Sequence, residues 1–310
     1  MSANILVSNI LRNFGGVTRN NLNNLINNAD DLDNAISIVS DSPYIDTDNL
    51  TEYLKPFSEN FSVLGLNIQC LNAKFDKFKA LLNELSNDDF EFSAICIQET
   101  WLEGTNPSMC LYELENYVSI PLGATCSSHS GLVIYLHQNY QYIVRDLYSP
   151  NKNWEGQFIH VFGNGLKQKI TLCNIYRPPR DRNDDIELFI NDLVPILAML
   201  SEERSDKLIL GDFNIDLLKV NTREKFSDFL NEMLNNNFLP KITLPSRFSE
   251  RSATLIDNIF CSLSRCNNAS LNGIIFTNLS DHLPYFTCLD QKLKPKGPPK
   301  YVQMECKKRE

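Results

Sequence analysis

The sequence predicts an α/β fold in which two packed sheets are flanked by helices. From Phe61 onwards, apolar runs of strand length alternate with segments whose apolar residues recur at helical spacing. Gly, Ser and Asn separate the runs of the strand-rich middle. Apolar residues make up 43% of the 310 positions, which is enough to bury a sizeable core. This order of elements favours an α/β sandwich.

The expected strands are spread over the whole chain after residue 60. In order they are FSVLGLNI, FSAICIQ, YVSI, GLVIYL, YQYIVRDL, GQFIHVF, KITLCNIY, LILGDFN, LIDNIF, GIIF and PYFTCL. Helical spacing of apolar residues predicts helices over 75–85, 186–200 and 226–234. Pro195 is expected to kink or interrupt the second helix.

The two ends of the chain differ in composition from the middle. Twelve of the first 60 residues are Asn, and their apolar residues are scattered. We therefore expect residues 1–58 to be a weakly ordered leader, with at most one or two short helices, that folding does not require. Residues 59–290 would form the domain, and residues 291–310 a basic tail rich in Pro and Lys.

Composition and charge exclude several classes of protein. The net charge of −9 argues against a generic nucleic-acid coat. No apolar run is long enough to span a membrane, and the N-terminus lacks the pattern of a secretory signal. The nine cysteines are odd in number and contain no CxxC pair. They predict free thiols in a reducing compartment, and hence an intracellular, nuclear protein.

Polar side chains follow several of the apolar strands. Asn67, Glu99, Asp212, Asp257 and His282 all stand at or near the end of such a run. A carboxylate just after a buried strand is unfavourable unless it is paired or ligated. Because strand ends of a layered fold gather on one rim, their repetition predicts a cluster. Hard oxygen ligands of this kind suit Mg²⁺.

Two short spacings indicate how such a cluster could work. Asp212 and Asn214 are two residues apart, so on an extended segment both point to one face and could hold a water between them. Asp281 beside His282 is the pattern in which a carboxylate sets the tautomer of an imidazole, provided that a turn brings them together.

Six segments in this order resemble the motif series of the exonuclease–endonuclease–phosphatase superfamily. They are NIQCLNAK, QETW, NIYRPP, LILGDFN, TLIDNIF and SDHLP, and they cover about residues 61–290. QETW, YRPP and SDH most resemble the apurinic-type endonuclease domain of non-LTR retrotransposons. The resemblance implies a DNase I-like fold, which is a four-layer α/β/β/α sandwich of two packed mixed sheets flanked by helices.

The resemblance also implies a metal site. Glu99 would be the main ligand of Mg²⁺, with Mn²⁺ as an alternative cation. Asn67 would contact the metal or its water, and Asp281 would be a second carboxylate of the site. Gln69 is a departure, because the repair-type branch has an Asp two residues after its Asn. This departure weakens a repair function and leaves the retroelement hypothesis intact.

The remaining implied roles concern the phosphate and the attacking water. Tyr176 and Arg177 would contact the scissile phosphate, supported by Asn174. Asp212 would activate or orient the water, Asn214 would position water or phosphate, and Asp257 would orient His282. His282 would stabilise the charge of the pentavalent phosphate. Residue identity leaves open whether Asp212 or His282 is the base.

The leading hypothesis is therefore a Mg²⁺-dependent DNA endonuclease that nicks one strand and leaves a 3′-hydroxyl, as in retrotransposon target-site cleavage. The expected partner is DNA, with no membrane and a monomeric state. Phosphoinositide or other phosphoester substrates, and a catalytically silent binding remnant, remain alternatives. His129 is interpreted as structural, although it could lie on a loop near the site. Trp101 is expected to pack beneath the metal loop rather than to stack on a base.

Overall fold

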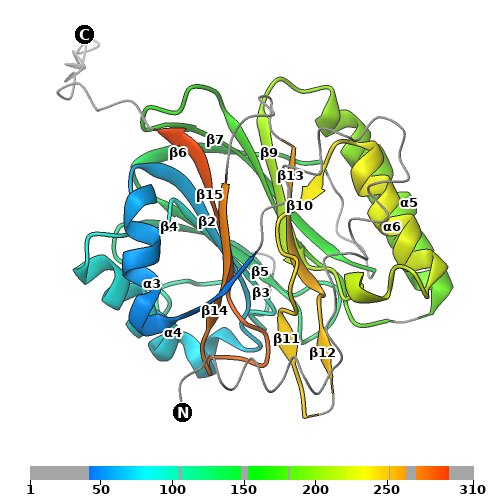
Figure 1. The fold of residues 1–310 in the computed structure, drawn as a ribbon, viewed down its shortest axis with the longest axis horizontal. Coiled ribbons are helices and arrows are strands. Elements are labelled where there is room, and N and C mark those ends of the chain that lie inside the picture. The colour runs from blue at the N-terminus through cyan, green and yellow to red at the C-terminus, as the bar shows by residue number, and fades with distance from the viewer. Residues whose placement is uncertain are drawn as a thin grey trace, which may run out of the picture.

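The two central sheets of the protein lie face to face, and helices cover their outer faces (Figure 1). The computed structural model describes residues 42–104, 107–147, 153–180, 182–250, 252–262 and 270–292. Helices α3 and α4 lie on the outer side of one sheet, and α5 and α6 lie on the outer side of the other. The predicted α/β/β/α sandwich is confirmed.

The larger sheet has seven strands in the order β1-β14-β15-β2-β3-β5-β4. They are β1 (Tyr44–Asp46), β2 (Asn60–Asn67), β3 (Ala94–Gln98), β4 (Tyr117–Leu122), β5 (Leu132–His137), β14 (Ser270–Phe276) and β15 (Tyr285–Lys292). Strands β2 and β3 are parallel and are joined by helix α4 (Leu71–Asn87). Their C-terminal ends therefore meet at the same rim of the sheet.

The second sheet has six strands in the order β10-β13-β9-β8-β7-β6. They are β6 (Tyr140–Val144), β7 (Glu155–Gly163), β8 (Ile170–Tyr176), β9 (Asp206–Asp212), β10 (Leu239–Pro240) and β13 (Asp257–Ser262). Strands β8 and β9 are parallel and are joined by helix α5 (Asn183–Ser201). A short hairpin of β11 (Arg247–Phe248) and β12 (Ala253–Thr254) stands apart from both sheets.

The alternation of side chains along a strand separates the core into two parts. On β2, Phe61 and Val63 pack in the cluster shared with the second sheet. Leu64 and Leu66 point the other way and pack in the cluster shared with α3 and α4. Helix α6 (Glu224–Asn235) contacts α5 and, through its apolar stripe, covers the second sheet. Strands buried on both faces explain why their sequences are continuous apolar runs rather than alternating ones.

The sequence placed the start of the packed fold at residue 59. In the structure, the packed fold begins earlier in the chain. Strand β1 pairs in parallel with β14, and helix α3 (Thr47–Leu54) buries Leu50 and Leu54 completely. The partner strand is more than 200 residues away, so no local pattern reveals this pairing. Residues 1–41 of the expected leader, and residues 293–310 of the expected tail, lie outside the described residues.

Pro195 does not interrupt helix α5, which continues from Asn183 to Ser201. The proline ring lies on the exposed side of the helix. There, water can bond the backbone carbonyl that loses its helical partner, so the helix tolerates the residue. Within the described residues, no helix has the length and hydropathy of a membrane span.

Candidate active site

The parallel strands of the two sheets bring polar residues to one rim of the sandwich. Asn67 ends β2, and Glu99 follows β3 directly. In the second sheet, Tyr176 at the end of β8 lies opposite Asp212 at the end of β9. A Cβ atom on Gly211 would collide with the backbone carbonyl of Ile175, so glycine is needed for β9 to approach β8 this closely.

Asn67 joins the two halves of the site. Its Nδ2 donates to Oε1 of Glu99 at 2.8 Å and to Oδ2 of Asp212 at 2.8 Å. Its Oδ1 accepts from the backbone N–H of Gln69 at 3.1 Å. The amide therefore bridges the two carboxylates as a donor, because each of them is an acceptor. The contact of Asn67 with a metal or its water stays a prediction.

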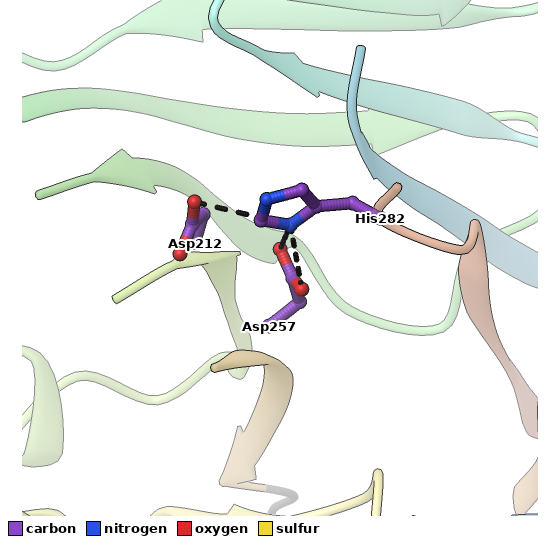
Figure 2. A group of neighbouring side chains, drawn as sticks. All are labelled: Asp212, Asp257 and His282. Carbon is purple, nitrogen blue, oxygen red and sulfur yellow. Dashed lines mark hydrogen bonds and ion pairs between the residues drawn. The ribbon is translucent and has the colours of Figure 1, made fainter. Parts of the chain in front are cut away.

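His282 is oriented by Asp257. Its Nδ1 lies 3.0 and 2.9 Å from the two carboxylate oxygens of Asp257 and 4.0 Å from Oδ2 of Asp212 (Figure 2). Ser246 donates to the Asp257 carboxylate at 2.7 Å and fixes it. Because Nδ1 carries the proton shared with Asp257, Nε2 is the ring nitrogen left for the pocket that His282 lines.

Burial and mutual charge shift the acid–base properties of this group. Burial raises the pKa of Asp212 to about 7, and the charge of Asp257 acts in the same direction, against the opposing charge of His282. Burial disfavours the imidazolium of His282, but the charge and hydrogen bond of Asp257 outweigh it and raise the pKa of His282 to about 9. Near neutral pH, His282 is therefore a cation, and Asp212 holds its proton more tightly than a carboxyl group in water does.

Asn214 and Tyr176 complete the surroundings of the carboxylates. The backbone N–H of Asn214 donates to Oδ1 of Asp212 at 2.9 Å, and its Nδ2 donates to Oδ2 at 3.1 Å. Asn214 adopts a left-handed φ of +47°, which turns it back over Asp212. The Tyr176 hydroxyl bonds the carboxylate of Glu99, and burial raises the pKa of this phenol, so Tyr176 is a neutral donor.

Arg177 and Asn174 lie inside the protein. The guanidinium of Arg177 is 1% exposed and donates to the backbone carbonyls of Phe213, Asn214 and Arg180 at 2.7 to 2.8 Å. Asn174 is fully buried and bonds Gln98 and backbone carbonyls of the opposite sheet. In the structure Arg177 holds the loops after β8 and β9, and Asn174 joins the sheets. The phosphate contact expected of Arg177, and the support expected of Asn174, stay predictions.

Asp281 does not orient its neighbour His282. Its Oδ2 accepts from Nε of Arg247 at 2.9 Å, while Asp257 occupies the imidazole. Adjacent side chains of an extended segment point apart, which explains the separation. Lys74 on α4 lies within electrostatic reach of both Asp281 and Glu99. Asp281 therefore belongs to the rim of the site, and its role at a metal stays a prediction.

An open pocket of about 480 Å³ lies over these residues. Its lining holds Glu99, Tyr176, Asn214 and His282 from the predicted set. It also holds residues that the sequence did not assign to the site, and these are Gln69, Trp101, Ser127, His129, Pro178, Pro179, Arg180 and Arg247. Arg180 directly follows the YRPP motif, so its position along the chain was the available signal.

The donor set suits a hard divalent cation. Glu99 is half-buried and lines the pocket, so its carboxylate is available to a cation there. Asp212, Asp257 and His282 also offer ligand atoms within 4.8 Å of one another. We favour Glu99 as the ligand, because Asp257 already holds Nδ1 of His282 and all three residues of that group are buried.

The fold and this site define a phosphoesterase. A family model described as the Endonuclease/Exonuclease/phosphatase family matches residues 64–282, and the chain belongs to this family. The family uses a divalent metal, and the acids at the rim fit that requirement. Membership of the family does not define the substrate.

Solved structures of other proteins share the fold at low identity. An AP endonuclease from Leishmania major is 16% identical, with a TM-score of 0.60 over 88% of this chain and 98% of that chain. The endonuclease domain of TRAS1, a telomere-specific non-LTR retrotransposon, is 14% identical, with a TM-score of 0.55 over 76% and 100%. The 3′ phosphatase NExo from Neisseria, bound to a product DNA hairpin, is 15% identical, with a TM-score of 0.57 over 74% and 100%.

Proposed function

We propose that the protein is a Mg²⁺-dependent DNA endonuclease that nicks one strand and leaves a 3′-hydroxyl. The observation that carries this proposal is the Asn67 bridge between Glu99 and Asp212, with the His282–Asp257 pair beside it. The bridge joins Glu99, which lines the pocket and is available to a cation, to the buried Asp212, whose pKa is raised. A cation and a proton acceptor together suit metal-assisted hydrolysis of a phosphodiester.

The residues divide the reaction between them. Glu99 would hold the cation, which supplies positive charge to the phosphate and to the attacking water. Asp212 takes the proton of that water, and Asn214 helps to aim it. The imidazolium of His282 stabilises charge on the phosphoryl oxygens through Nε2–H. The water oxygen bonds to phosphorus and the P–O3′ bond breaks. The departing O3′ takes a proton from solvent, which leaves a 3′-hydroxyl and a 5′-phosphate.

DNA is the proposed substrate for three reasons. The motif order resembles the endonuclease domain of non-LTR retrotransposons, and a similar fold occurs in such a domain. Two proteins of similar fold were solved with product DNA, one as a hairpin and one as a single strand. Arg180 and Arg247 line the pocket and offer cationic contacts to a phosphate backbone.

Incubation of supercoiled plasmid with the protein and Mg²⁺ tests the proposal. Open-circular product should form, chelator should abolish it, and a polymerase should extend the nick without phosphatase treatment. Asp212→Asn and His282→Ala should each lower the rate by at least about 10²-fold. The matched control is Asp185→Asn, since Asp185 lies on the first turn of α5, does not line the pocket, and forms an ion pair with the exposed Arg182.

Other outcomes would select the alternatives. Phosphate release from a phosphoinositide without nicking would favour another phosphoester substrate. Binding of DNA with neither activity would favour a silent remnant. Nicking that persists in excess chelator would remove the metal from the proposal, and full nicking by folded Asp212→Asn would remove Asp212 as the base.

An intracellular, nuclear location is also proposed. Asn278 begins an Asn-Leu-Ser sequon, is exposed, and stands three residues before Asp281. A glycan there would crowd the pocket. Secreted protein that is glycosylated at Asn278 would contradict both the location and the position of the site.

A further inference from the structure

Trp101 and His129 form an aromatic ledge at the edge of the pocket. Trp101 is 36% exposed, and His129 is also exposed. Their ring centroids are 4.7 Å apart at an interplanar angle of 85°, so the edge of one ring meets the face of the other. Both residues line the pocket that contains Glu99 and His282. The expectation that Trp101 packs beneath the metal loop is therefore wrong.

The ledge is held in a fixed position by Glu155, a residue that the sequence did not bring forward. Glu155 is fully buried at the start of β7 and accepts hydrogen bonds from the loop that carries His129. The donors are Thr125 N, Thr125 Oγ1, Cys126 N, Ser130 Oγ and Gly131 N, at 2.5 to 3.0 Å. Backbone carbonyls of the same loop accept hydrogen bonds from the backbone N–H groups of Thr100 and Trp101.

The backbone at Glu99 and Trp101 adopts a strained conformation, and the ring of Trp101 is exposed. Glu99 and Trp101 have φ values of +52° and +58°, a region that bulky residues rarely adopt. Trp101 Nε1 donates to Oε2 of Glu99 at 3.3 Å, which ties the ring to the proposed metal ligand. Strain of this kind persists where the surrounding structure enforces it, and it clusters at functional sites.

Trp154 shows what a structural tryptophan looks like in this chain. It is completely buried, its Nε1 donates to Asp192, and its ring packs against Phe189. Trp101 instead leaves over a third of its surface open, in a pocket that Arg180 and Arg247 also line. An exposed aromatic face next to cations suits a ligand in which planar rings alternate with phosphates.

We infer that the Trp101–His129 ledge is a stacking subsite for a nucleobase adjacent to the scissile phosphate. This inference rests on the proposed function, because the phosphate beside it is the one proposed to be cleaved. A base that stacks there must be unpaired or at a distorted step, since a stacked duplex does not present its ring face. The ledge would therefore favour sites that open easily, without reading base identity.

Three variants separate the ring from its other contacts. Trp101→Phe keeps an aromatic face but loses the Nε1 bond to Glu99, whereas Trp101→Ala loses both. His129→Ala removes the second ring. Tyr142→Ala is the matched control, because Tyr142 is 37% exposed on β6 and does not line the pocket.

Binding is measured in chelator by the anisotropy of a labelled single-stranded thymidine dodecamer, and compared with the same strand made of abasic residues. Trp101→Ala should weaken binding of the thymidine strand about tenfold, in line with base stacking on aromatic residues. Trp101→Phe should stay within about twofold, and the abasic strand should bind all variants alike. The intrinsic fluorescence of Trp101 should be quenched by the thymidine strand and not by the abasic one.

The inference is overturned if Trp101→Ala binds the thymidine strand like the unaltered protein, or if Trp101→Phe loses as much as Trp101→Ala. The second result would assign the effect to the Glu99 contact. Failure of the two proposals can be told apart. Ring-dependent binding without nicking would reject the endonuclease and keep the subsite, and nicking with ring-independent binding would do the reverse.

Discussion

Replacing Asp257 by Asn should remove a pH-dependent part of the free energy of unfolding. The pKa of His282 is lowered by burial but raised more strongly by Asp257, from 6.5 to about 9 in the folded protein. Because the folded pKa exceeds the unfolded one, this stabilisation is complete below pH 6.5 and is lost as the pH rises through 9. Between pH 7 and 9.5 the loss amounts to about 2 kcal/mol, at 1.36 kcal/mol per pKa unit.

Urea unfolding in chelator at pH 7 and 9.5 measures this quantity. Asp257→Asn should be less stable at both pH values, since Ser246 and His282 lose a charged acceptor. The decisive number is the difference between the two pH values, which should shrink by about 2 kcal/mol relative to the unaltered protein. Groups away from Asp257 contribute equally to both proteins and to the control, Asp185→Asn, whereas Asp212, whose pKa Asp257 also raises, adds a smaller change of the same sign. An equal pH difference in all three proteins would refute the reasoning.

Three further predictions concern the metal, the start of the fold and the buried arginine. Glu99→Gln should raise the Mg²⁺ concentration needed for half-maximal nicking, because it removes an anionic oxygen ligand, and an unchanged requirement would exclude Glu99 as the ligand. A chain that begins at residue 59 should unfold at lower urea than one that begins at residue 42. The shorter chain lacks β1 and the two buried leucines of α3, and the burial of each leucine side chain is worth roughly 1.5–3 kcal/mol. Equal urea midpoints would count against the packing of α3. Arg177→Lys should lower the free energy of unfolding by roughly 2 kcal/mol, as judged by urea midpoints. The DNA affinity of Arg177→Lys should not change. A selective loss of affinity would instead support a contact between Arg177 and a phosphate.

The sequence predicted the main strands and helices because the apolar periodicity of each is local. Strands β2, β3, β8 and β9 appear as continuous apolar runs, and the structure buries them on both faces. It did not predict β1, whose three residues carry no pattern of their own and gain their partner from β14. Pairing between segments far apart in the chain depends on tertiary packing.

For the candidate site, the sequence predicted which residues gather, but less well what each contacts. Asp212, Asp257 and His282 meet because Asp212 ends β9, Asp257 begins the antiparallel strand β13 opposite it, and His282 lies just before β15. For Arg177, a basic residue in a polar motif suggested a phosphate, and no local pattern revealed that Phe213 and Asn214 after β9 and Arg180 after β8 each supply a backbone carbonyl to it. Glu155 gave no signal, because its five donors come from a loop without regular structure.

The hydrogen bond from Asn67 to Asp212 joins the two sheets. The acid pair of Glu99 and Asp212 therefore depends on the packing of one sheet against the other. Glu99 and Asn67 come from one sheet and Asp212 from the other, and the bond between Gln98 and Asn174 joins the same two sheets in the interior. A folding intermediate with only one sheet formed would hold one carboxylate without its counterpart. The acid pair therefore forms only when both sheets have packed against each other.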